Sequence, residues 1–148
     1  MKKIFAFLIS ISIILFVLLY SIDFMAKDIS YYNNFHRDYK IEKESGLSKE
    51  WIEGASNSLV EFIKSGDKEV LKNHFNKKEI SHMEDVYKLF KLDRIVYTSL
   101  FIITLLVVIY KLFKNDFLFF RYIRKYILIA YISVISFLGI CSLFFSES

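Results

Sequence analysis

The 148-residue chain contains no proline, four glycines and a single cysteine. One cysteine excludes an internal disulfide, and neither an internal repeat nor a low-complexity linker is evident. The sequence also has no phosphate-binding loop, no Gly-x-Ser-x-Gly nucleophile elbow and no Cys-x-x-Cys pair. The local motifs of nucleotide hydrolases, serine hydrolases and dithiol redox proteins are therefore missing. A chain of this length forms one domain at most.

Apolar residues are in excess. Hydrophobic residues make up 55% of the chain and aromatic residues 18%, which is above the level of an ordinary soluble domain. They concentrate in three blocks, at residues 4–22, 95–113 and 126–145. Each block approaches the roughly 20 residues that a helix needs to cross a bilayer, and isolated segments in lipid must be helical. The sequence predicts an all-α membrane protein with transmembrane helices at 1–22, 95–113 and 126–145.

The distribution of basic residues predicts the orientation. The loop at 114–125 holds four Lys or Arg against one Asp, and two lysines follow Met1. By the positive-inside rule both are cytoplasmic, which places residues 23–94 and the tail at 146–148 outside the cell membrane. The net charge of +4 follows from this topology, so no nucleic-acid partner is expected. Residues 4–22 resemble a secretory signal in part, but their length and the lack of a small-x-small cleavage site favour an uncleaved span.

The segment at 23–94 has several helix boundaries. A helix is predicted between Ser48, a typical N-cap, and Gly66, a typical terminator, and its apolar stripe includes Trp51. Asp67 can cap a short turn that follows. Asn76 and Glu79 form a capping-box pair, so a helix is expected to begin there and to run into the second span. Residues 28–46 are less regular and indicate loop or interfacial structure.

The helix expected at 77–92 has an apolar face formed by Ile80, Met83, Val86, Tyr87 and Phe90. Such a face gains little from water. We therefore expect this helix to lie along the outer membrane surface, with a bend at residues 91–94 before the second span.

Three titratable residues, Glu79, His82 and Asp85, stand three apart and share one edge of this helix. An imidazole exchanges a proton near neutral pH, and a carboxylate one turn away can orient it. His82 is the catalytic candidate, with Glu79 and Asp85 beside it; the alternative is an interfacial histidine among surface ion pairs. A metal set of His74, His82 and Asp85 lacks a compact ligand motif, so neither metal nor cofactor is expected. His74 and His36 are interpreted as surface residues.

The block Glu79-x-x-His82-Met83-x-Asp85-Val86, which leads into the second span, resembles the bacterial lipoprotein intramolecular transacylase family. Tyr31, Tyr32 and Asn34, shortly after the first span, are softer matches. The resemblance implies movement of an acyl chain from the glyceryl ester of a diacylated lipoprotein to the amine of its N-terminal Cys, which gives the lyso-form. It also implies that membrane lipid and this lipoprotein are the partners, and that His82, Glu79 and Asp85 are the site.

The chain departs from the family pattern in one respect. That pattern includes a second outer loop with another functional histidine and a fourth span, whereas no histidine follows His82 here. We therefore expect an N-terminal part of a four-span enzyme that is inactive alone. The alternatives are a non-catalytic small multi-pass membrane protein that binds a partner or senses the envelope, and a signal-anchored outer domain with a two-helix tail.

Overall fold

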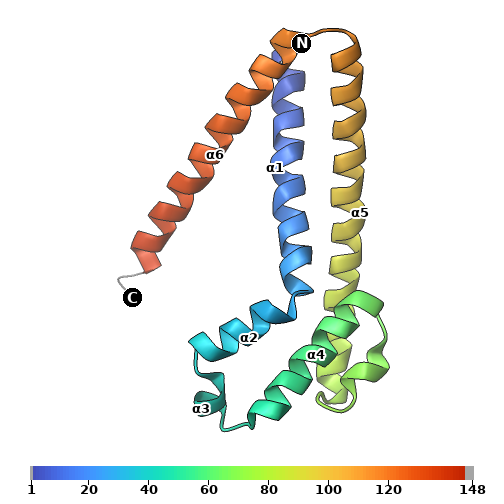
Figure 1. Ribbon diagram of the computed structural model, residues 1–148, viewed down its shortest axis with the longest axis vertical. Helices are drawn as coiled ribbons and strands as arrows, with labels where there is room; N and C mark the ends of the chain where they lie inside the picture. The colour runs from blue at the N-terminus through green and yellow to red at the C-terminus, as the bar shows by residue number, and fades with distance from the viewer. Residues whose placement is uncertain (1, 146–148) are drawn as a thin grey trace. The chain divides into compact units, whose positions relative to one another are not determined.

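The computed structural model describes the backbone of residues 2–145 and the side-chain surroundings of residues 2–133, 135 and 136. Every regular element in this range is helical, so the predicted all-α class is confirmed (Figure 1). The elements are α1 (Lys2–Ala26), α2 (Ile29–Asp38), α3 (Ile41–Ser45), α4 (Lys49–Ser65), the 3-10 turn η1 (Lys68–Leu71), α5 (Lys77–Phe113) and α6 (Phe117–Phe145). They divide into two compact units: Met1–Leu18 with Tyr97–Ser148, and Leu19–Val96.

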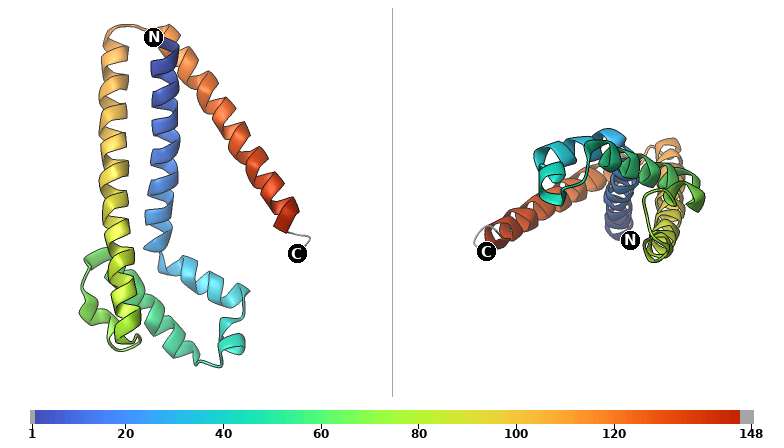
Figure 2. Two further views of the ribbon diagram at one scale, coloured as in Figure 1. Left: turned by 180° about the vertical axis from the view of Figure 1, so that it is seen from behind. Right: turned by 90° about the horizontal axis from the view of Figure 1, so that it is seen from below.

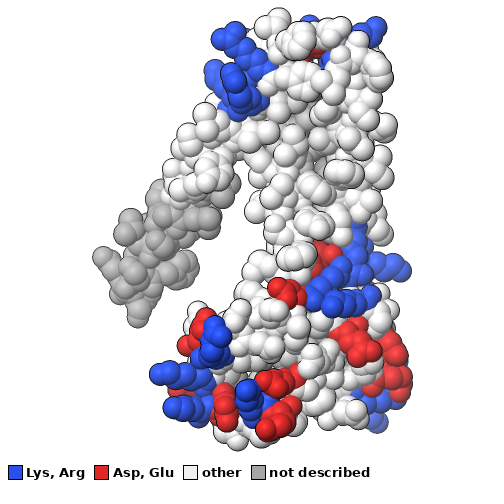
Figure 3. Space-filling view, viewed as in Figure 1, with Lys and Arg blue, Asp and Glu red and all other residues white. Residues whose placement is uncertain are grey.

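The first unit has an apolar core between α1 and α6. Ala6, Ile9, Phe119 and Ile123 are buried against one another, and the small side chain of Ala6 allows the two helices to approach closely. At the turn between α5 and α6, Asp116 accepts from Lys111 Nζ at 3.1 Å. Basic side chains gather at this turn, whereas the adjoining helix surfaces are almost free of charge (Figure 3).

Two helices, α1 and α5, are long and apolar enough to cross a membrane. Two of the three predicted spans therefore correspond to such helices. Helix α6 covers the third predicted span at 126–145, but the side chains of residues 134 and 137–145 lie outside the described part of the chain. The third span remains a prediction, as does the tail at 146–148.

The second unit is built from α2, α3, α4 and η1 with the adjoining ends of α1 and α5. Helix α2 begins shortly after α1 ends, and α3 leads on to α4 (Figures 1 and 2). Ser48 Oγ accepts from the N–H of Trp51 at 3.2 Å, and Gly66 ends α4 in the left-handed conformation with φ 78°. Asp67 Oδ1 accepts from the N–H of Glu69 at 3.0 Å and starts η1. All three predicted boundaries are confirmed.

Residues 29–38 and 41–45 are helical, so the loop interpretation of this region is wrong. Asp28 caps α2 by accepting from the N–H of Ser30 at 2.9 Å. Tyr32 and His36, four residues apart on α2, are half-buried and line the same hollow as residues of α4. The side of α2 that carries Tyr32 and His36 is defined by its proximity to α4. The sequence pattern of residues 29–38 alone therefore does not indicate a helix.

The bend expected at residues 91–94 is absent, because the backbone of α5 is helical throughout Lys77–Phe113. Sharp kinks arise mostly at Pro, at Gly or at bulges, and α5 contains neither Pro nor Gly. One member of the apolar face that motivated the bend packs on α4: the ring of Tyr87 lies 5.3 Å from that of Phe62. Tyr87 therefore has a protein partner that a sequence-based argument could not supply.

Buried charges join the C-terminal end of α1 to α5. Asp23 is 3% exposed, and its carboxylate accepts from Arg94 Nε at 3.0 Å and from Lys27. Arg94 also donates to the carbonyl of Ile63 on α4. One arginine thus connects three helices of the second unit. Because a buried carboxylate is costly without partners, these contacts fix how the helices pack.

Candidate functional site

His82 lies exposed near the start of α5, on the wall of an open hollow of about 810 Å³. We call this the His82 hollow. It is lined by Trp51, His74, Phe75, Asn76, Lys78, Glu79, His82 and Met83. Its volume lies in the range of small-molecule sites. Apolar and titratable side chains meet there, so an amphiphilic substrate can place both of its parts in contact with the protein.

The first turn of α5 fixes the position of His82 through a reciprocal cap. Asn76 Oδ1 accepts from the backbone N–H groups of Lys78 and Glu79, each at 3.0 Å. In return, Glu79 Oε2 accepts from the N–H of Asn76 at 2.8 Å. The predicted capping box is confirmed. Because these bonds satisfy donors that a helix start leaves unpaired, the turn that precedes His82 is held in place.

The lining also contains His74, which is half-buried, so the prediction of a surface residue is wrong. Its Nδ1 lies 3.2 Å from Ser58 Oγ, and its ring meets that of Trp51 edge to face at 5.7 Å. A Cβ built on Gly54 would lie 2.7 Å from His74 Nε2. Glycine in the middle of α4 therefore makes room for this imidazole. The presence of Gly54 within a helical pattern was the only signal in the sequence.

Glu79 and Asp85 share the edge of α5 with His82 but already have other partners. Glu79 belongs to the cap, and Asp85 accepts from Lys88 Nζ at 2.8 Å. Among the described residues, no hydrogen bond joins either carboxylate to His82. The hydrogen bond from Lys88 and its charge lower the pKa of Asp85, and the nearby His82 contributes a smaller effect in the same direction. The spacing thus brings Asp85 close enough to His82 for their charges to interact.

Metal ligation has no support in the described part of the chain, where no three His, Cys, Asp or Glu side chains gather closely enough to hold an ion. His74, His82 and Asp85 therefore do not form a ligand set. What the hollow offers is one exposed imidazole, a fixed helix start and an apolar wall, a combination suited to proton transfer beside an acyl chain.

The described residues form helices only, and two of these helices are long and apolar enough to cross a membrane. His82 lies near the start of the second of them, α5. A family model described as lipoprotein intramolecular transacylase Lit matches residues 7–148. The chain belongs to this family of integral membrane proteins, and the resemblance noted in the sequence is confirmed. Neither a curated protein nor a solved structure matches the chain.

Proposed function

We propose that the chain acts in intramolecular acyl transfer on diacylated lipoproteins and that the reaction takes place in the His82 hollow. Two observations support this. The family match covers residues 7–148, and the exposed imidazole of His82 lies in a hollow that also has an apolar wall. The hollow carries the proposal, because acyl transfer to an amine needs a proton acceptor beside a place for a hydrocarbon chain.

The proposed step is an isomerisation. The nitrogen of the N-terminal Cys attacks the carbonyl carbon of a glyceryl ester, so that a C–N bond forms and the C–O bond to glycerol breaks. The proton lost by the nitrogen ends on the glycerol oxygen. An α-amino group has a pKa near 8 and is partly protonated at neutral pH, so a base is required first. Because amine and ester belong to one molecule, correct placement supplies much of the rate.

His82 is the proposed base and then the proton donor to the departing oxygen, a role in which imidazole is common. Glu79 is the proposed positioning residue, because its carboxylate holds the first turn of α5 through the N–H of Asn76. Asp85 is proposed to act on His82 through its charge, since the neighbouring imidazole contributes to lowering the pKa of the Asp85 carboxyl group, after the larger effect of Lys88. Trp51, Phe75 and Met83 offer the apolar contact for the acyl chain.

We further propose that the spans at 1–22, 95–113 and 126–145 cross the cell membrane, with the N-terminus and the loop at 114–125 in the cytoplasm. This placement is supported by the two apolar helices and by the basic residues gathered at the turn between α5 and α6 (Figure 3). Residues 23–94 and the His82 hollow are then on the outer side, where lipoproteins carry their acylated N-termini.

The experiment is expression of the chain in a bacterial host without another transacylase, followed by mass spectrometry of the lipoprotein N-terminus. The lack of a histidine after His82 predicts a chain that is inactive alone, whereas the family match over residues 7–148 and the His82 hollow favour activity. We therefore expect an unchanged total mass, because the reaction is an isomerisation, with fragments that place one acyl chain on the Cys nitrogen. A His82→Ala chain at equal abundance serves as the control. Detection of the diacylglyceryl form alone in both strains would favour the non-catalytic alternative of a partner-binding membrane protein.

A further inference from the structure

Two neighbouring hollows lie between α2, α3 and α4. One of them shares Phe75 with the His82 hollow, but neither contains any of the residues assigned to proton transfer. The first, the apolar hollow, has a volume of about 410 Å³ and is lined by Tyr31, Tyr32, Phe35, His36, Ala55, Ser56, Leu59 and Phe75. The second, the charged hollow, has a volume of about 400 Å³. It is lined by Asn33, His36, Arg37, Glu42, Lys49, Ile52 and Glu53. Both lie within the range of ligand sites.

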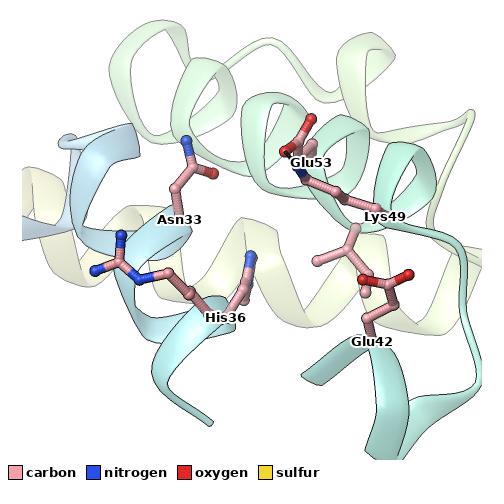
Figure 4. A pocket seen from close by; sticks show the side chains of 7 residues that line it. Asn33, His36, Glu42, Lys49 and Glu53 are labelled. Carbon is pink, nitrogen blue, oxygen red and sulfur yellow. Dashed lines mark ion pairs between the residues drawn. The ribbon is translucent and has the colours of Figure 1, made fainter. Parts of the chain in front are cut away.

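His36 belongs to both hollows. Its Nδ1 is buried without a hydrogen-bond partner, and such a group costs free energy until a ligand or water satisfies it. In Figure 4 the side chains of Asn33 and His36 rise from α2, opposite Lys49 and Glu53 on α4. The imidazole therefore stands where an apolar space meets a polar one.

The charged hollow carries both signs of charge. Lys49 Nζ lies 3.7 Å from Glu53 Oε1, and both side chains are exposed, so this pair is weak and free to exchange partners. Arg37 is the second cation, and Glu42 adds a second carboxylate. A lining of this kind fits a group that itself bears a phosphate and an ammonium, since each charge meets an opposite one.

Helix α2 has the features of a helix that lies at a membrane surface. It begins at Ile29, shortly after the long apolar helix α1 ends at Ala26. One side of α2 carries exposed aromatic rings at helical spacing: Tyr31 is 45% exposed and Phe35 42%, and Tyr39 just beyond the helix is 64% exposed. Amphipathic helices with aromatic side chains at this depth lie in the headgroup zone. Because Tyr31 and Phe35 also line the apolar hollow, its rim adjoins that zone.

We propose that the two hollows together bind one zwitterionic glycerophospholipid of the membrane. An acyl chain occupies the apolar hollow against Tyr32, Ala55 and Leu59. The ester carbonyl accepts from His36 Nδ1–H. The phosphate meets Arg37 and Lys49, and the headgroup ammonium meets Glu42 and Glu53. This lipid is neither substrate nor product of the acyl transfer, and it fills the space between α2 and α4 in the outer segment.

The test is photolabelling of the full chain in phosphatidylcholine vesicles doped with phosphatidylethanolamine that carries a diazirine in its acyl chain, with label sites mapped by mass spectrometry. We expect label on α2 and on the stretch of α4 from Ala55 to Leu59. Ala55→Phe fills the apolar hollow and should abolish this label, whereas Leu89→Phe, on an exposed position of α5, should leave it. Equal labelling at these sites in Ala55→Phe overturns the proposal.

A second pair of variants covers the case in which Ala55→Phe does not fold. Lys49→Glu places a carboxylate at the phosphate and should weaken capture roughly tenfold, the equivalent of one charge-assisted hydrogen bond. Lys72→Glu also breaks an exposed ion pair, with Glu69 at 2.6 Å, but lies outside both hollows and should have no effect. Equal capture by the two variants overturns the proposal. Displacement of the label by a synthetic diacylated lipopeptide also overturns it and assigns the hollows to the substrate.

Discussion

Arg94 Nε lies 3.0 Å from Asp23 Oδ1, across 71 positions of sequence, and this pair connects the end of α1 to α5. Asp23 has its side chain only 4% exposed. Since Arg94 also donates to the Ile63 carbonyl, the same side chain holds α4 beside them. Lys27, just beyond the end of α1, is the second partner of the carboxylate, so the pair belongs to a small ionic network that positions the helices of the second unit.

Arg94→Gln is expected to lower the free energy of unfolding by about 1–3 kcal/mol, because it leaves a buried acceptor with one partner fewer. Chemical unfolding of the purified protein in mild detergent measures this change. Arg37→Gln is the matched control, since Arg37 pairs with Asp38 at the surface with side chains 74% and 62% exposed, and exposed pairs contribute little. Equal effects of the two substitutions would contradict the structural role of Arg94.

Two glycines with positive φ give a second test. A Cβ added at Gly66 (φ 78°) would lie 2.6 Å from the ring of Tyr87. A Cβ added at Gly46 (φ 69°) would meet no atom within 4 Å. Gly46→Ala should cost about 1–2 kcal/mol for the left-handed backbone alone. Gly66→Ala should cost more, because Tyr87 must also move away from α4. Thermal unfolding of both variants checks the order, and a smaller loss for Gly66→Ala would show that Tyr87 does not pack as described.

Glu79 allows a structural role to be separated from a chemical one. Gln preserves a capping box, since its side-chain oxygen also accepts from the N-cap N–H. Glu79→Gln should therefore keep both stability and acyl transfer, whereas Glu79→Ala should lose roughly 1 kcal/mol of stability and part of the activity. Unfolding and lyso-lipoprotein formation are measured on the same preparations. A stable but inactive Glu79→Gln protein would show that the charge itself is needed beside His82.

The proposed topology predicts which sites react with a membrane-impermeant thiol reagent in intact cells. After replacement of the single native cysteine, Cys141, by serine, a cysteine at Asn73 should be labelled. One at Lys114, in the loop proposed as cytoplasmic, should be labelled only after the membrane is opened. Both positions are exposed on the protein, so protection reflects the membrane. Labelling of Lys114→Cys in intact cells would contradict the proposed orientation and place this loop outside.

Local chemistry explains which parts of this fold could be predicted from sequence. Ser48, Gly66 and the Asn76–Glu79 pair bond to neighbours within a few residues, so their roles follow from spacing. The Asp23–Arg94 pair joins distant positions, and no local pattern announces it. The expectation of a bend at 91–94 is wrong because it assigns the whole apolar face to lipid, whereas Tyr87 packs against Phe62 of α4. Tertiary packing decided the outcome in both cases.

The candidate site shows the same division. The helical edge of Glu79, His82 and Asp85 follows from their spacing alone. The half-buried His74 could not be placed, because its position depends on Ser58 and Gly54, which face it from another helix. The interpretation of His36 as a surface residue is wrong for the same reason, because its Nδ1 is buried and its side chain lines a hollow together with residues of α4. Residues whose surroundings come from a second helix were the ones that sequence reasoning missed.

The most direct test of the central claim is the rate at which purified protein in lipid vesicles converts a synthetic diacylated lipopeptide into its lyso-form, with His82→Ala compared against the original chain. Removal of a general base is expected to lower this rate by about 10²–10⁴, with helical content and unfolding unchanged. Ser81→Ala, at the exposed neighbouring position on α5, should keep the full rate. An undiminished rate in well-folded His82→Ala protein would contradict the account.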